Sequence, residues 1–223
     1  MKNLLKNIVS RKFKIPTLTS KKENEPIIIM NDNKELEKLK GKVVFLSAGH
    51  RGSGTGANGF IDEGKETIAF RDKLKVALIQ RGIIVDGDFG KEKESLSSIM
   101  NYIKNKCKFG DISIDIHFNA VADSKVSGTE VIIPTKYVKL EHDLATTMSN
   151  TMSTTLKIKN RGVKTEVQTA HGTLGMLSGF SCLNFLIEIC FVSNKTDSTN
   201  YNLYNEQLIE NLADDIKNFI LNN

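Results

Sequence analysis

The sequence from Gly41 to the C-terminus alternates between short apolar runs and longer segments whose apolar residues are spaced as on one face of a helix. Strands that alternate with helices are typical of a sheet that helices cover. We therefore predict an α/β fold of three layers, with a largely parallel or mixed central sheet and helices on both of its faces. Its strands are expected at 42–47, 83–85, 111–117, 129–133 and 183–189, and its helices at 69–81, 95–106, 140–156 and 207–221.

The N-terminal segment differs from the rest of the chain in charge. Residues 1–22 contain seven lysines and arginines and no acidic residue, so the net charge of +5 for the whole chain leaves −2 for residues 23–223. A basic nucleic-acid-binding face should lie in the folded domain, so we expect no nucleic acid partner. We interpret residues 1–40 as a basic tail and linker, with a short edge strand at 26–30, and residues 41–223 as the folded domain.

Two interpretations of the tail are open. Leu4, Leu5, Ile8 and Val9 share one face of a short helix with lysines on its other faces, and such a helix could contact an anionic membrane surface. Alternatively, the tail is a solvated terminus without fixed structure. Polar residues interrupt the apolar stretch and no small-residue cleavage site follows, so we expect no secretory signal peptide.

Composition argues against two further classes of protein. No apolar run approaches the ~20 residues that span a bilayer. The three cysteines are an odd number without metal-ligand spacing. The sequence therefore predicts neither a membrane-spanning protein nor a disulfide framework.

Two histidines and one glutamate stand at or near the ends of predicted strands. His50 follows the first strand, His117 ends the third, and Glu188 lies near the end of the last. Active sites of α/β proteins collect at the carboxyl ends of the strands. Two imidazoles with one or more carboxylates could hold a zinc ion there and leave one coordination position open for water.

The loop after His50 contains a glycine pattern with two meanings. Residues 54–59 match G-x-G-x-x-G, which binds dinucleotides when it comes directly off a strand and opens a helix. Here six residues separate the pattern from the strand, and the next helical spacing starts only after Asp62. We interpret the glycines instead as a loop that folds flat around a site.

Several motifs occur in one order along the chain: Ala48-Gly49-His50 with its glycine-rich loop, an acidic residue that opens the next helix, and the segments IHFNA at 116–120, GTEV at 128–131, RGVK at 161–164 and IEICFVSN at 187–194. Together they resemble the zinc-dependent N-acetylmuramoyl-L-alanine amidases of bacterial and bacteriophage cell-wall lysis. The resemblance extends from about Gly41 to the C-terminus. It implies that His50, Glu63 and His117 bind Zn2+ and that Glu188 is catalytic.

The choice of the acidic ligand has an alternative. Glu66 lies one turn after Glu63, so the two could share a helix face and Glu66 could serve instead. Glu63 is preferred because its spacing to the segment 70–72 and to Gly82 looks like that of the family. Arg51 departs from the family, which more often has glycine there, and this bears on loop shape or substrate contact.

The resemblance also implies a reaction. It is hydrolysis of the amide bond between N-acetylmuramic acid and L-alanine in peptidoglycan, by zinc-activated water with Glu188 as general base and acid. A zinc endopeptidase of the stem peptide and a non-catalytic cell-wall-binding or virion protein are the alternatives. The phage-like motifs and the lack of a signal peptide lead us to expect an endolysin that stays in the host cytoplasm until lysis and then acts on the cell wall.

Other polar residues either line the substrate site or serve only the fold. Asn119 and Asn194 could orient a ligand or cap a turn, and His171 could lie in the groove or on the surface. A basic cluster meets anionic groups of the substrate or is simply exposed; its members are Lys157, Lys159, Arg161 and Lys164.

Overall fold

The computed structural model describes residues 37–39, 41–89, 94–170 and 172–223. The proposed membrane contact of the tail, the edge strand at 26–30 and His171 lie outside these residues. No helix in the described part of the chain is both long and apolar enough to cross a membrane.

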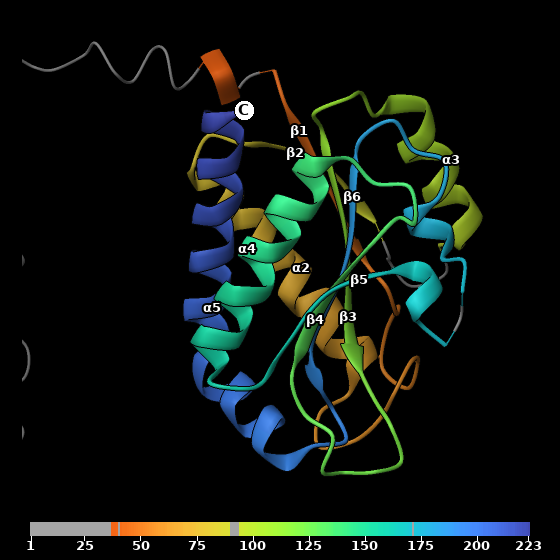
Figure 1. Cartoon of the computed structure of the whole chain (residues 1–223), viewed down its shortest axis with the longest axis vertical. Helices are drawn as coiled ribbons and strands as arrows, with labels where there is room; N and C mark the ends of the chain where they lie inside the picture. The colour runs from red at the N-terminus through yellow and green to blue at the C-terminus, as the bar shows by residue number, and fades with distance from the viewer. Residues whose placement is uncertain (1–36, 40, 90–93, 171) are drawn as a thin grey trace, which may run out of the picture.

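A six-stranded mixed sheet forms the centre of the molecule (Figure 1). The spatial order is β2-β1-β3-β6-β4-β5. The first four strands in that order run parallel, whereas β4 is antiparallel to β6 and parallel to β5. The strands are β1 (Val43–Ala48), β2 (Ile84–Phe89), β3 (Ile112–Asn119), β4 (Thr129–Ile133), β5 (Asn160–Thr165) and β6 (Leu183–Phe191).

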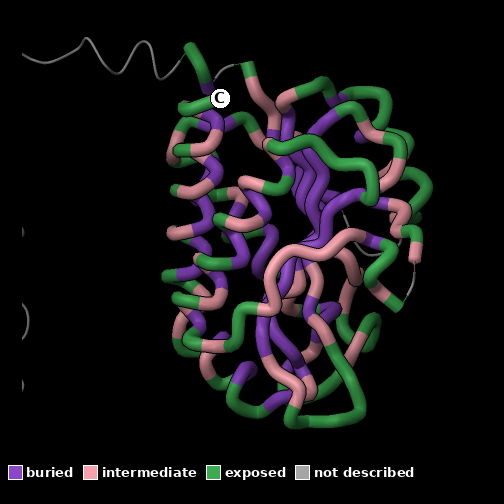
Figure 2. Tube along the Cα trace, viewed as in Figure 1, coloured by how far each residue is buried: buried purple, intermediate pink, exposed green. Residues whose placement is uncertain are grey.

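Helices cover both faces of this sheet, as predicted. One face packs against α2 (Glu63–Gln80), α4 (Lys139–Leu156) and α5 (Lys195–Asn222), whose apolar side chains form one core with the strands. The other face packs against α3 (Leu96–Lys106) through a smaller core that includes Phe45 and Ile99. Figure 2 shows the buried residues concentrated along the strands and along the inner faces of the helices. The three-layer α/β prediction is confirmed.

Helix α2 begins six residues before the predicted residue 69 and β2 extends four residues beyond the predicted residue 85, but two other elements differ more from the sequence prediction. Helix α5 begins at Lys195, well before the predicted residue 207, because the Asn194 side chain accepts a hydrogen bond from the Asp197 backbone N–H and starts the helix there. Strand β5 was not predicted at all. It is a polar, half-buried edge strand, so its sequence lacks the apolar run that marks the inner strands.

Candidate active site

A row of polar side chains crosses three neighbouring strands on one face of the sheet. His117 of β3 is the register partner of Glu188 of β6, and Glu188 is in turn the partner of Glu130 of β4. Residues opposite one another in a sheet point to the same side. The fold therefore places an imidazole and two carboxyl groups next to one another near the carboxyl ends of β3 and β6.

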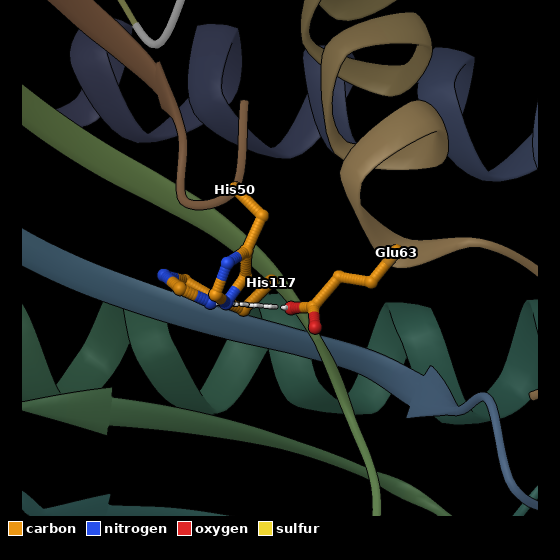
Figure 3. Close-up of side chains that lie close together, drawn as sticks. All are labelled: His50, Glu63 and His117. Atoms are coloured by element: carbon orange, nitrogen blue, oxygen red, sulfur yellow. Dashed lines mark ion pairs between the residues drawn. The ribbon is translucent and has the colours of Figure 1, made fainter. Parts of the chain in front are cut away.

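His50 and Glu63 approach this row from outside the sheet (Figure 3). His50 lies in the loop after β1, and Glu63 is the first residue of α2. Oε1 of Glu63 lies 3.5 Å from Nε2 of His50 and 3.3 Å from Nδ1 of His117. One donor atom from each of the three residues lies within 4.8 Å of the others, as in a group that could hold a metal ion.

Glu63 is fixed in this position by backbone groups. The helix starts next to it because the Asp62 side chain accepts from the Lys65 N–H. Its carboxylate accepts hydrogen bonds from the N–H of Ala57 at 2.7 Å and of Phe118 at 3.1 Å. Burial raises the pKa of the Glu63 carboxyl, but these bonds and His117 outweigh it and the net pKa is lowered. The group is therefore a fixed anion at neutral pH.

Glu66, the alternative ligand, points elsewhere. Its Oε2 accepts a hydrogen bond from the Tyr201 hydroxyl of α5 at 3.1 Å. The structure thus brings Glu63, and not Glu66, to the two histidines.

The His117 ring is held by a second carboxylate. Its Nε2 lies 3.1 Å from Oδ2 of Asp115, two residues earlier on the same face of β3. In the neutral tautomer that donates its Nε2–H to this carboxylate, the lone pair of the ring lies on Nδ1, toward Glu63. Gly49 allows this placement, since a Cβ there would lie 1.9 Å from Nε2 of His117.

The two histidines differ in their charge preference. Burial lowers the pKa of His50, and it outweighs the opposing effect of Glu63. Burial also lowers the pKa of His117, but the carboxyl groups of Asp115, Glu63 and Glu188 outweigh it and raise this pKa well above its usual value. The carboxyl groups of Asp115, Glu63 and Glu188 thus surround the half-buried His117 with negative charge, which favours a bound cation at this site.

Glu188 lies beside this cluster, in register with His117. Its Oε2 is buried and makes no hydrogen bond within the described part of the chain. Burial raises the pKa of Glu188 to about 8; His117 opposes this effect, and the carboxyl groups of Glu63 and Glu130 add to it. A carboxyl group with this pKa takes up and releases its proton near neutral pH.

One cavity of about 460 Å³ is lined by the side chains of His50, Glu63, His117 and Glu188. The lining also includes Glu130 of β4, two strands from His117 in the same row, with Arg161 and Lys164 of β5. The rest of the lining comes mainly from the segment after β3 and the segment after β5, including Asn119, Ala120, Val121, Gln168, Thr169, Ala170 and Leu174.

A comparison with protein families agrees with this geometry. The family model described as N-acetylmuramoyl-L-alanine amidase matches residues 44–222, which is most of the chain. The chain belongs to this family.

Individual relatives of this amidase-family chain are distant. The probable cell wall amidase LytH of Staphylococcus aureus is 27% identical over 173 residues, which are 77% of this chain and 55% of that protein. The chain thus spans about half the length of the curated relatives it matches.

Solved structures share the fold. The N-acetylmuramoyl-L-alanine amidase from Clostridium difficile 630 has a TM-score of 0.65 at 21% identity, with 81% of this chain and 95% of that chain covered. The catalytic domain of the CD27L endolysin, which targets the same species, has a TM-score of 0.64 at 23% identity, with 81% and 97% covered. The α/β fold is therefore that of the amidases.

The other predicted residues of the amidase domain take different places. Asn119 donates to Oε1 of Glu130 at 3.2 Å, and Asn194 caps α5. The basic cluster divides: Arg161 and Lys164 reach the cavity, whereas Lys159 is exposed and Lys157 donates to the hydroxyl of a tyrosine on α5.

Sequence reasoning assigned no role to Asp115 and Glu130. Both lie in strand segments that were otherwise read as apolar. An acidic residue within a buried strand is costly unless it has a partner, and this was the signal that could have identified them.

Proposed function

We propose that this chain hydrolyses the amide bond between N-acetylmuramic acid and L-alanine in peptidoglycan. In this proposal His50, Glu63 and His117 hold a zinc ion and Glu188 is the general base and acid. The observation that supports it most is the buried Oε2 of Glu188, which makes no hydrogen bond among the described residues and belongs to a residue in register with His117 of the His–Glu–His cluster.

The donor set fits a zinc ion. Two imidazoles and one carboxylate are a ligand set of catalytic zinc sites, and zinc dependence is the norm in this family. The negative potential around His117 and the fixed anion of Glu63 favour a divalent cation at this place. When bound, the ion supplies a Lewis acid that activates water and polarises the amide carbonyl.

Glu188 performs the proton transfers in this proposal. Water must lose a proton to attack, and the departing amide nitrogen must gain one to leave. The Glu188 carboxyl lies beside the cluster, and nothing in the described residues competes for its Oε2. It can therefore take the first proton and deliver it to the nitrogen.

Neighbouring groups keep the reacting residues in place. Asp115 orients the His117 ring, and the backbone N–H groups of Ala57 and Phe118 orient the Glu63 carboxylate. Fixed ligands need little rearrangement during the reaction.

The test compares variants on a soluble muramoyl-L-alanyl peptide. Glu188→Gln is expected to lower kcat by about 100-fold or more, with the zinc content per chain unchanged. His117→Ala is expected to lose both zinc and activity. Glu206→Gln on α5, whose side chain is 75% exposed, is the matched control for the loss of a carboxylate.

Three results would contradict the proposal. Wild-type activity in Glu188→Gln would exclude its role in proton transfer. A product that retains alanine on the muramic acid would indicate the alternative, a zinc endopeptidase of the stem peptide, and the absence of any cleavage would indicate a cell-wall-binding or virion protein.

We also propose that the protein is a phage endolysin that remains in the host cytoplasm until lysis. The support is the order of the phage-like motifs and the likeness of the fold to the catalytic domain of an endolysin. The full chain, expressed in a bacterial cytoplasm, should lyse the cells only after the membrane is permeabilised. Lysis without permeabilisation would contradict this.

A membrane contact through residues 1–40 stays part of the same proposal. It predicts that a peptide of residues 1–40 binds anionic vesicles more strongly than a scrambled peptide of the same composition. Equal binding by the two peptides would remove it.

A further inference from the structure

The part of the cavity lining at β4 and β5 carries more positive charge than its own carboxylate requires. Oε2 of Glu130 accepts hydrogen bonds from Nε of Arg161 at 2.6 Å and from Nζ of Lys164 at 2.5 Å. Glu130 is buried, whereas about a quarter of each basic side chain is exposed. We call these three residues the Glu130 cluster. Its formal charge is +1.

An irregularity in β5 brings both basic residues to the cavity. In a regular strand, residues three positions apart point to opposite faces. Here the register shifts between Thr129 and Val131, so β5 has one extra residue, and Gly162 has the positive φ of +80° that such a bulge uses. The bulge therefore turns Arg161 and Lys164 to the same side.

Arg161 is fixed by its surroundings. Its guanidinium carbon lies 5.0 Å from the centre of the Phe191 ring. Its aliphatic part lies close to Gly128, where an added Cβ would come within 3.0 Å of Cγ. Within the described residues only its Nε donates to a protein acceptor. Both Arg161 and Lys164 line the cavity. Among the described residues, the Nη atoms of Arg161 have no hydrogen-bond acceptor, and Lys164 donates only to Glu130.

The distance to the proposed reacting centre suits a short peptide. Glu130 stands two strands from His117, and adjacent strands are about 4.8 Å apart, so the cluster lies about 10 Å from the histidine. An extended peptide spans about 3.3–3.6 Å per residue. The scissile amide joins muramic acid to alanine, the first residue of the stem peptide. When this amide lies at His117 and Glu188, a group on the second residue of the stem peptide can therefore reach the Glu130 cluster.

We propose that Arg161 and Lys164 bind a free carboxylate on the stem-peptide residue that follows the alanine, so that the enzyme prefers substrates with this carboxylate over those with a carboxamide. The inference rests on the proposed function, because it deepens the substrate class of the same site. The cavity lining then holds two complementary groups: the His–Glu–His cluster for a cation, and the basic pair Arg161 and Lys164 for an anion.

The physical reason for the preference is the loss of a charge-assisted contact. A carboxylate accepts hydrogen bonds from both basic groups, whereas a carboxamide is neutral and presents an NH2 group to them. Hydrogen bonds between charged groups are about twice as strong as neutral ones. We expect the carboxylate substrate to be favoured by about tenfold or more in kcat/KM.

The test uses a synthetic muramoyl-L-alanyl-alanine and its C-terminal carboxamide, so that the residue after the scissile bond's alanine carries one carboxylate in the first substrate and none in the second. The wild-type chain should show the preference of about tenfold or more in kcat/KM. Lys164→Gln should reduce the ratio to below about threefold. Lys159→Gln, an exposed lysine on the approach to β5, removes the same charge and should keep the wild-type ratio.

Two outcomes overturn the inference. Equal kcat/KM for the two substrates in the wild type would mean that the Glu130 cluster does not recognise the carboxylate. An equal loss on both substrates in Lys164→Gln would mean that the cluster only holds β4 and β5 together.

Binding separates this inference from the proposed function. If neither substrate is cleaved, the proposed function fails, and calorimetry with the Glu188→Gln protein decides the inference. Tighter binding of the carboxylate form, lost in the Glu188→Gln/Lys164→Gln double variant, supports the subsite. Equal binding of the two forms overturns it.

Discussion

Replacement of Asp115 tests how the proposed zinc site is held in place. Oδ2 of Asp115 lies 3.1 Å from Nε2 of His117, while its buried Oδ1 makes no hydrogen bond within the described residues. Within the described residues, His117 is thus the one hydrogen-bond partner of the Asp115 side chain. We predict that changes at Asp115 weaken zinc binding more than they weaken the ion-free fold.

The size of the effect follows from the contact that is lost. Removing a group that orients a metal-bound histidine lowers metal affinity by about 10–100-fold. Asp115→Asn keeps an acceptor but not the charge, so we expect about tenfold. Asp115→Ala removes both, so we expect a value nearer 100-fold.

A thermal shift measures the same loss. At a zinc concentration of about 1,000 times the wild-type Kd, the ion stabilises the folded state by about 4.1 kcal/mol. A Kd that is 10–100-fold weaker reduces this to about 2.7 or 1.4 kcal/mol. For a domain of this size, the zinc-induced rise in Tm should shrink by about 3 to 10 °C.

The assay is competition with a chelator of known affinity, together with Tm with and without zinc. Asp123→Asn, in the exposed loop after β3, is the matched control and should keep the wild-type affinity. Wild-type zinc affinity in Asp115→Ala would refute the positioning role. An ion-free Tm that falls as much as the zinc-bound Tm would show that Asp115 acts only on the fold.

Three further predictions concern pH, the glycine loop and a helix cap. Because the folded pKa of Glu188, about 8, lies above the ordinary value of 4.5, the folded state keeps a proton that the unfolded state releases. The free energy of unfolding of the ion-free protein, measured by urea titration, should therefore fall as the pH rises from 4.5 to 8. In Glu188→Gln this fall should be smaller. An equal fall in the wild type and the variant would contradict the raised pKa of Glu188. Gly56→Ala places a Cβ 2.5 Å from His50 and should weaken zinc binding measurably, whereas Gly54→Ala, with a similar φ but open space, should not; equal effects in a zinc titration would refute this. Asn194→Ala should cost about 1–2 kcal/mol in a urea titration through loss of the α5 cap, and an unchanged midpoint would contradict it.

The inner part of the fold could be predicted from the sequence because burial on both sides leaves a clear apolar run. The strands β1, β3, β4 and β6 were all located, and the mixed sheet between helices followed from their alternation with helical segments. Edge strand β5 and the start of α5 were missed, because their polar residues face water or cap an end. In both places hydrogen bonding, and not apolar spacing, decides the structure.

The sequence was enough to predict which four residues make up the centre of the candidate site. His50, Glu63, His117 and Glu188 mark the ends of apolar runs or the start of a helix, and the fold brings them together. The position of Glu130 beside Glu188 depends on cross-strand register, and the contact between Asp115 and His117 depends on side-chain orientation. A single sequence gives neither of these.

The orientation of Arg161 and Lys164 toward one cavity depends likewise on the bulge at Gly162. A spacing of three along a strand predicts opposite faces, so the sequence alone favours the wrong arrangement. The register in the structure was needed to place both residues at the site.

The most direct test of the central claim is mass analysis of the fragments released from purified peptidoglycan by the full chain, with and without a chelator. We predict free stem peptides that begin at L-alanine, lost when the metal is removed and restored by added zinc. Release that persists in the chelator, or disaccharide still joined to a shortened peptide, would contradict the account.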